Sequence, residues 1–262
     1  MSIVTSKDGT TIAYEQIGSG PALVLIDGAM CYRAAGPMRP VAALLQEHFT
    51  VYTYDRRGRG GSGDTLPFAV AREVEDLRAV IGAADGDVGV YAMSSGGALA
   101  LATAAVEPAI TALALYETPF MAGDGGDVAA KEYTEVLHEL LTEGRRGDAV
   151  ALFMTYVGVP VQAIDGMRTQ PAWAMFEAIA PTLAYDDAAL AGGRIPRDLT
   201  SRLTIPTLVL TGSASPDGLR QAAAATADAI PTAELTVLEG QTHDVAPAAL
   251  APVLVDFFGS IR

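Results

Sequence analysis

The chain has 262 residues, 50% of them hydrophobic, and a formal net charge of -14 at pH 7. That length and apolar fraction indicate a globular protein with a substantial core and exclude a disordered chain. Nucleic acids and anionic membranes attract basic surfaces, so the net charge argues against both as partners. A small-molecule substrate is the expected partner, and the oligomeric state stays open.

Cys31 is the single cysteine, which excludes an internal disulfide and argues against a cysteine-based metal site. The first twenty residues lack the charged start and long apolar stretch of a secretory signal. Apolar runs also stay shorter than the roughly 18 residues that a membrane span needs. We therefore expect a cytoplasmic protein. The many Ala and Gly residues, with Arg in place of most Lys, favour a bacterial source.

Strands and helices are expected to alternate along the first 120 residues, after a hairpin about Asp8-Gly9. Short apolar runs indicate strands buried on both faces, and apolar residues at helical spacing indicate helices. In chain order, the expected elements are a strand at 22–28, a helix at 35–49, a strand at 50–55, a helix at 69–84, a strand at 87–93, a helix at 95–106 and a strand at 110–117.

Residues 121–200 interrupt this alternation, because they contain helical patterns and no convincing strand. The alternation resumes with strands at 205–212 and 233–240 and helices at 219–230 and 245–261. This order predicts an α/β fold with a mostly parallel, doubly wound sheet. We expect a core of residues 1–120 and 201–262, with residues 121–200 as a helical cap over the carboxyl edge of the sheet, where ligands bind in such folds.

Two adjacent serines follow the strand expected at 87–93, in the stretch YAMSSGGALA. A nucleophilic serine in a tight strand-to-helix turn needs small residues two positions before and two after it. Ser94 has Ala92 and Gly96 there, whereas Ser95 has the bulky Met93 before it. Ser94 is therefore the predicted nucleophile, although Ala92 replaces the first glycine of the G-x-S-x-G pattern. Helix capping is the alternative role for these serines.

The chain resembles the α/β-hydrolase fold family over nearly its whole length, in the ordered stretches LVLIDGAM, YDRRGRGGSGD, YAMSSGGALA, TLVLTG and EGQTH. The resemblance implies a serine hydrolase whose oxyanion hole is formed by the backbone N–H groups of Ala29 and Ser95. Such a hole needs donors directed at the oxygen that becomes negative when the serine attacks. Asp27 departs from the family pattern, which usually has histidine at that position.

A serine nucleophile needs a base to remove its proton, and the chain contains three histidines. His243 follows the last expected strand, in LEGQTHD, which is where the family places its base. His48 ends an expected helix and His138 lies in the expected cap, so surface or packing roles are assigned to both. His243 is the predicted base.

The acid that orients His243 has two candidates. The family usually carries it in a Gly-x-x-Asp pattern after the strand TLVLTG, but Ser215 stands at that position. Glu117 ends the strand expected at 110–117, which is where relatives such as haloalkane dehalogenases place their acid. Glu117 is favoured, and Asp217 is the alternative if its loop is reshaped. A carboxylate that anchors the cap is the structural alternative for Glu117.

Four residues are predicted to lie near the substrate: Asp27, Met30, Tyr32 and Trp173. Asp27 has two interpretations, either ordering its loop through the side chain or contacting substrate and tuning His243. Trp173 is expected to add apolar bulk in the cap, unless it serves in packing between cap and core. Cys31 is expected to behave as a small buried hydrophobe.

Together these features predict an enzyme that cleaves a small to medium, largely apolar carboxylic ester, thioester or lactone through an acyl-enzyme on Ser94. No cofactor and no metal are expected. A non-hydrolytic catalyst or ligand-binding protein on the same fold is the alternative, and carbon–carbon hydrolysis or perhydrolysis stays open. The stretch GRGGSG at 58–63 matches a dinucleotide fingerprint, but it does not turn directly from strand into helix, which argues against NAD or FAD.

Overall fold

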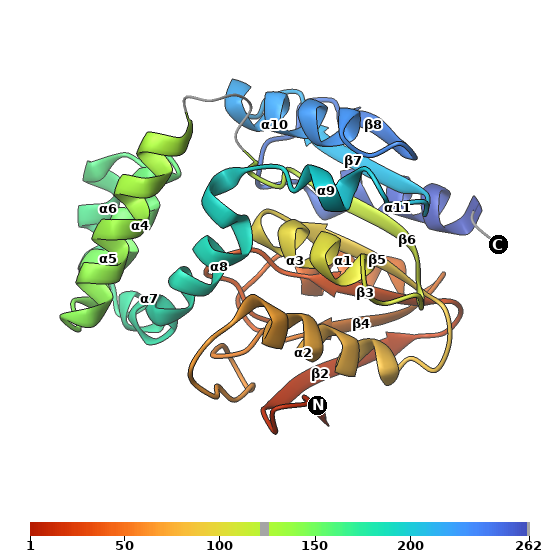
Figure 1. The fold of residues 1–262 in the computed structure, drawn as a ribbon, viewed down its shortest axis with the longest axis horizontal. Coiled ribbons are helices and arrows are strands. Elements are labelled where there is room, and N and C mark those ends of the chain that lie inside the picture. Colours follow the sequence, from red (N-terminus) through yellow and green to blue (C-terminus); the bar gives the residue numbers. More distant parts are fainter. Residues whose placement is uncertain (121–125, 261–262) are drawn as a thin grey trace.

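The computed structural model describes residues 1–120 and 126–260, and within them eight strands form one sheet (Figure 1). The order across the sheet is β1-β2-β4-β3-β5-β6-β7-β8. The strands are β1 (Ser2–Thr5), β2 (Thr11–Gly18), β3 (Ala22–Ile26), β4 (Thr50–Tyr54), β5 (Val88–Met93), β6 (Ile110–Tyr116), β7 (Thr207–Gly212) and β8 (Ala233–Leu238). The predicted hairpin pairs β1 with β2 antiparallel, β2 is antiparallel to β4, and every later pair is parallel.

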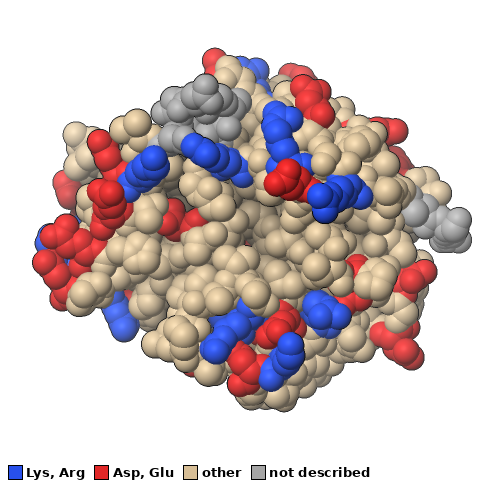
Figure 2. All heavy atoms as spheres, in the orientation of Figure 1, with Lys and Arg blue, Asp and Glu red and all other residues tan. Residues whose placement is uncertain are grey.

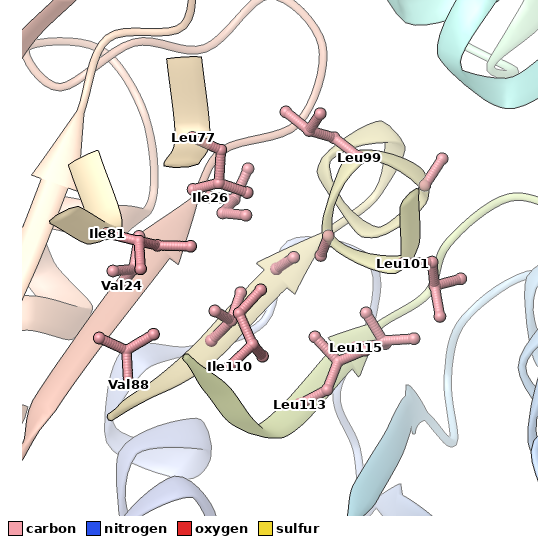
Figure 3. Close-up of a cluster of buried hydrophobic side chains, with 14 of the residues drawn as sticks. Val24, Ile26, Leu77, Ile81, Val88, Leu99, Leu101, Ile110, Leu113 and Leu115 are labelled. Carbon is pink, nitrogen blue, oxygen red and sulfur yellow. The ribbon is translucent and has the colours of Figure 1, made fainter. Parts of the chain in front are cut away.

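Helices cover both faces of this sheet, as the doubly wound prediction required. One layer contains α1 (Met38–Leu45) and α11 (Pro247–Ser260), which pack on each other. The opposite layer contains α2 (Val70–Gly82) and α3 (Ser95–Ala104). Figure 3 shows aliphatic side chains of β3, β5 and β6 meeting those of α2 and α3, among them Ile26, Leu77 and Leu99. The central strands are buried on both faces because they lie between these layers.

The parallel strands end together at one edge, and the loops that follow them carry the predicted site residues. β3 leads into residues 27–37, β5 into Ser94 and β6 into Glu117. β7 leads into α10 (Asp217–Asp228), and β8 leads into the loop that contains His243. In an open parallel sheet this carboxyl edge is where ligands bind.

The predicted insertion is helical throughout its described part, and it divides into two sets of helices. Helices α4 (Gly126–Thr142), α5 (Arg146–Tyr156), α6 (Val161–Arg168) and α7 (Trp173–Ile179) stand beside the sheet edge. Helices α8 (Leu183–Leu190) and α9 (Arg197–Thr200) return across the core and pack against α3. Residues 121–125, the predicted start of the cap, lie outside the described residues.

Helices α4 to α7 share their own apolar centre, built around Leu137, Val150 and Leu183 from the start of α8. Met30 from the loop after β3 also packs into this cluster, so the cap rests on that loop. In the described part of the chain, no helix combines the length and apolar character of a membrane span.

Candidate active site

Ser94 occupies a strained turn between β5 and α3. Its backbone has φ 52° and ψ -134°, outside the regions that L-residues ordinarily adopt. The Ser94 N–H donates to the Tyr116 carbonyl at 2.9 Å, which ties the turn to the end of β6. Such conformations cost about 1–3 kcal/mol and persist where the surrounding structure fixes them. The side chain is half-buried.

Glycines allow other segments to approach this turn. A Cβ on Gly96 would lie 2.7 Å from the Asp27 carbonyl oxygen, and one on Gly97 would overlap the Thr118 hydroxyl. On the facing loop, a Cβ on Gly28 would lie 2.8 Å from the Ser94 Cβ and 3.4 Å from its Oγ. The loop after β3 therefore lies directly against the Ser94 side chain.

His243 and Glu117 are brought together from different parts of the chain. The His243 Nδ1 lies 2.8 Å from the Glu117 Oε2. Glu117 follows β6 with φ 47°, and its carboxyl group is fully buried. Its other oxygen accepts hydrogen bonds of 2.8 Å from the Thr211 hydroxyl and from the Gly212 N–H.

These contacts determine the ionisation of Glu117. Burial alone would raise its pKa, but the hydrogen bonds from His243, Gly212 and Thr211, with the Ser215 hydroxyl nearby, outweigh burial and hold the pKa below its ordinary value. Glu117 is therefore a carboxylate at neutral pH. Because a carboxylate accepts and does not donate, the His243 Nδ1 must carry the proton of this contact. The Nε2 of a neutral His243 is then free to accept a proton.

Two contacts with the ends of β6 and β7 hold the loop that carries His243 in place. The Tyr116 hydroxyl donates to the Thr242 carbonyl at 2.5 Å, so β6 supports the residue before His243. Gly212 at the end of β7 lies so close to this loop that a Cβ there would be 2.1 Å from the Gln241 carbonyl oxygen. Neither contact was predicted from the sequence, because each joins positions far apart in the chain.

Asp217, the alternative acid, lies elsewhere. It begins α10 at the surface, where it forms an ion pair with Arg220 and its side chain is 78% exposed. Ser215, at the position where the family usually has its aspartate, is buried beside Glu117 and contributes to its lowered pKa. The structure thus places Glu117, and not Asp217, against His243.

The two predicted oxyanion donors lie on facing elements. Ser95 is the first residue of α3, and Ala29 lies in the loop after β3, before Met30 with φ 59°. The Arg59 side chain crosses beneath this loop and donates to the Gly28 carbonyl at 2.6 Å and the Cys31 carbonyl at 3.3 Å. These bonds anchor the loop that carries Ala29 to the loop after β4.

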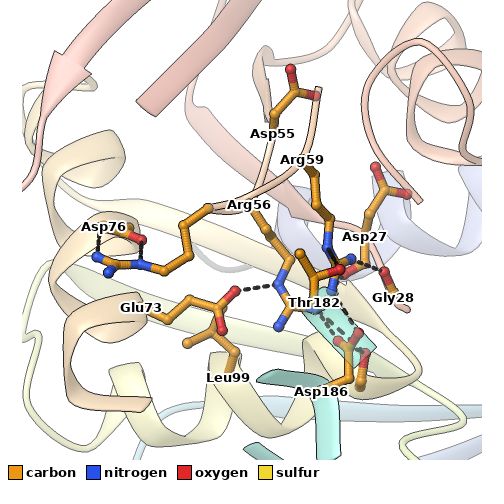
Figure 4. Close-up of polar contacts among 12 residues, drawn as sticks. Asp27, Gly28, Asp55, Arg56, Arg59, Glu73, Asp76, Leu99, Thr182 and Asp186 are labelled. Atoms are coloured by element: carbon orange, nitrogen blue, oxygen red, sulfur yellow. Dashed lines mark hydrogen bonds and ion pairs between the residues drawn. The ribbon is translucent and has the colours of Figure 1, made fainter. Parts of the chain in front are cut away.

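Arg59 belongs to a buried ionic cluster that the sequence analysis did not find (Figure 4). Its guanidinium donates to the Asp186 Oδ2 at 2.6 Å, and Arg56 donates to the Asp186 Oδ1 at 2.7 Å and to Glu73 at 2.5 Å. All four side chains are at most 5% exposed. Asp186 comes from α8, so the cluster joins the inserted helices to the core.

The sequence signal that could have indicated this cluster is the run of arginines in DRRGRG, directly after a buried strand. The glycines of this stretch wrap the loop around Asp55, which accepts from the Gly61 N–H at 2.7 Å. Residues 64–69 then separate the last glycine from α2. The dinucleotide fingerprint, in which the strand turns directly into a helix, is therefore not formed here.

Asp27 is buried beneath the loop after β3 and is 2% exposed. A Cβ on Gly36 would lie 2.8 Å from its Oδ1 and 3.1 Å from the Cys31 Cβ, so the carboxyl group faces the approach to α1. Burial raises its pKa to about 7, although Arg59, Arg56 and the Met38 N–H favour the charged form. This placement favours the loop-ordering interpretation. Cys31 is half-buried, and this burial raises its thiol pKa to about 12.

The remaining predicted substrate residues have different surroundings. Tyr32 lines a cleft of about 570 Å³ between α7 and the core, and its hydroxyl lies 3.9 Å from the Met175 sulfur. Met30 and Trp173 are buried in the apolar cluster of the cap. The Trp173 indole donates to Glu177 at 3.1 Å within the same helix, which favours the packing role.

The face of the molecule seen in Figure 2 is largely uncharged across its middle, with acidic and basic side chains gathered toward its margins. Among residues 1–120 and 126–260, no three His, Cys, Asp or Glu side chains are arranged to hold a metal ion.

Comparison with known proteins gives a consistent picture. Residues 20–253 match the model of the Alpha/beta hydrolase family. The chain is 49% identical to a crystal structure of an alpha/beta hydrolase from Sphaerobacter thermophilus, with a TM-score of 0.88 and coverage of 98% of this chain and 100% of that one.

More distant structures share the fold. An esterase from Exiguobacterium antarcticum is 19% identical with a TM-score of 0.75, covering 98% of this chain and 99% of that one. A bromoperoxidase from Bacillus anthracis is 18% identical with a TM-score of 0.74, covering 98% and 100%.

Proposed function

Because the chain belongs to the alpha/beta hydrolase family, we propose that it is a serine hydrolase that cleaves a small to medium, largely apolar carboxylic ester, thioester or lactone. The observation that carries this proposal is the contact of 2.8 Å between the His243 Nδ1 and the buried Glu117 carboxylate, in a segment to which the strained Ser94 turn is tied through the Tyr116 carbonyl. A histidine oriented in this way is what a serine nucleophile needs.

In the proposed reaction, the Ser94 Oγ attacks the carbonyl carbon and His243 takes the hydroxyl proton on Nε2. Glu117 stabilises the resulting imidazolium through Nδ1 and fixes the orientation of the ring. The Ala29 and Ser95 N–H groups bind the oxygen that becomes negative. His243 then gives the proton to the leaving alcohol, thiol or ring oxygen, and a water molecule releases the acyl group by the same steps.

The apolar preference of the proposed substrate follows from the surroundings of the site. The loop after β3 packs Met30 into the apolar cluster of the cap, and Ala29 and Tyr32 lie against the same cluster. An acyl or alcohol group lying between these elements would remove apolar surface from water, at about 25 cal/mol for each Å².

Labelling with a fluorophosphonate tests the proposal, because this probe reacts with serines that have both an active base and an oxyanion hole. The intact mass should increase by one adduct, and peptide mapping should place it on Ser94. The Ser94→Ala variant should take up no adduct and hydrolyse no p-nitrophenyl ester. An adduct on Ser95, or ester hydrolysis that survives Ser94→Ala, would contradict the proposal.

A further inference from the structure

Asp186 reaches from the inserted helices to both sides of the candidate oxyanion hole. Its side chain lies in α8 and is 5% exposed. Its Oδ1 accepts from the Ser95 hydroxyl at 2.7 Å, and its Oδ2 accepts from the Arg59 guanidinium at 2.6 Å. Arg56 binds the Oδ1 as well, at 2.7 Å. One carboxylate thus holds groups from two separate segments of the core, the start of α3 and the loop after β4.

The contacts of Asp186 with Ser95 and with Arg59 each reach a segment that carries one of the two proposed oxyanion donors. Ser95 begins α3, and its own N–H is one of the two proposed donors. Arg59 binds the carbonyls of Gly28 and Cys31, which flank the second proposed donor, Ala29. The two donors lie more than sixty residues apart in the chain, so local structure does not fix the spacing between them. The Asp186 side chain connects the start of α3, through Ser95, with the loop after β3, through Arg59.

We propose that Asp186 is a positioning residue, which holds the Ala29 and Ser95 N–H groups at the separation that an oxyanion requires. The inference rests on the proposed serine hydrolase function. On this proposal the geometry of the oxyanion hole depends on the cap, because Asp186 belongs to the inserted helices. A displacement of about 1 Å in such a site lowers the rate by about 10²-fold.

The charge of Asp186 suits this role. Burial would raise its pKa, but Arg59, Arg56 and the Ser95 hydroxyl outweigh burial and hold the pKa below its ordinary value. Asp186 is therefore a carboxylate, and both oxygens accept strong, charge-assisted hydrogen bonds. An asparagine would keep one acceptor and present an NH₂ group to a guanidinium, which also donates.

The test compares Asp186→Asn with Asp187→Asn, a matched control in the same helix. Asp187 accepts a hydrogen bond from Thr134 of α4 at 2.8 Å, so this control alters a contact within the cap and leaves the oxyanion loop untouched. Hydrolysis of p-nitrophenyl butyrate is measured for each, and kcat is divided by the fraction of protein that is folded, as determined by circular dichroism. The Ki of a trifluoromethyl ketone, which forms an oxyanion on the serine, is measured in parallel.

We expect Asp186→Asn to lower the corrected kcat by about 10- to 100-fold and to raise the Ki by a similar factor, with KM changed by less than about threefold. Asp187→Asn should leave all three values near those of the wild-type chain. A role in stability alone would lower the melting temperature and the folded fraction while leaving the corrected kcat and the Ki unchanged. That result would overturn the inference.

Ser95→Ala keeps the test decisive if Asp186→Asn does not fold. This variant removes the hydroxyl bond to Asp186 but keeps the backbone N–H and every buried charge. We expect the corrected kcat to fall about tenfold, and an unchanged value would overturn the inference. If the wild-type chain is not labelled on Ser94, the proposed function fails and the inference with it. Normal wild-type labelling with fully active variants would refute the inference alone.

Discussion

At the carboxyl ends of β6, β7 and β8, Glu117 is held by short hydrogen bonds from neutral groups and by His243. At the ends of β3 and β4, the loop against Ser94 is instead held by buried ion pairs between Arg56, Arg59 and Asp186. The hydrogen bonds around Glu117 come only from core strands and the loops that follow them. The ion pairs beside the loop after β3 require Asp186, which belongs to the insertion. The site therefore joins a region independent of the cap to a region that depends on it.

The largest expected effect comes from the region independent of the cap. Glu117→Gln keeps the shape of the side chain but removes the charge that fixes the His243 tautomer. If the proposed function holds, kcat should fall by about 10³- to 10⁴-fold, which is the loss typical of a triad whose acid is neutralised. Steady-state kinetics on a p-nitrophenyl ester measure it. Asp217→Asn is the control and should retain full activity, and a loss of less than about tenfold in Glu117→Gln would assign the acid elsewhere.

The next effect concerns stability in the region that depends on the cap. The Asp27 pKa is about 7 in the folded chain and 3.8 in the reference state, so the folded chain keeps this proton between those values while the unfolded chain loses it. The free energy of unfolding should therefore fall as pH rises from about 4 to about 7. The Asp27→Asn variant should lack this fall, which is on the order of 4 kcal/mol.

Urea unfolding of both chains at pH 4.5 and pH 7.5 measures this difference. The change with pH in the wild-type chain, minus that in Asp27→Asn, removes every contribution that the two share. Equal changes in both chains would show that Asp27 is ionised in the folded state and that Arg59 and Arg56 overcome its burial.

A smaller effect is expected when the His243 loop is displaced without touching a titrating group. Alanine at Gly212 would put its Cβ against the Gln241 carbonyl, and the loop must move to accept it. We expect kcat to fall by about 10²-fold because His243 moves with the loop. Gly218→Ala is the control, since nothing lies within 4 Å of a Cβ there. Equal kinetics for the two variants would show that the loop adapts without moving His243.

The smallest expected effect is the loss of one hydrogen bond in the same region. Tyr116→Phe removes the bond from the hydroxyl to the Thr242 carbonyl, which is worth about 1 kcal/mol. We expect kcat to fall a few-fold. Tyr14→Phe, on the hairpin at the opposite side of the sheet, should change nothing. If Tyr116→Phe lowered kcat as much as Gly212→Ala does, the Tyr116 hydroxyl would be the main support of the His243 loop.

The fold was predictable because its buried strands are short apolar runs and its helices have apolar residues at helical spacing. Ser94 was predictable for a local reason, since Ala92 and Gly96 lie beside it in the chain. Glu117 was favoured on a resemblance, and the structure places it against His243. Asp186 was not found, because its partners Arg56 and Arg59 lie about 130 residues away and a carboxylate in α8 has the pattern of an ordinary helix residue.

The position of Asp186 also determines how this chain could exchange segments with its relatives. Helices α4 to α7 pack on one another around an apolar centre to which α8 adds Leu183 and the core adds Met30, so another protein's cap could replace them if it packs on those two side chains. Helix α8 carries the partner of two core arginines. A chimera joined after α8 would leave both guanidiniums buried without that carboxylate, which costs about 3–5 kcal/mol. A chimera joined between α7 and α8 would keep the ion pairs intact, so new substrate pockets are best grafted at that junction.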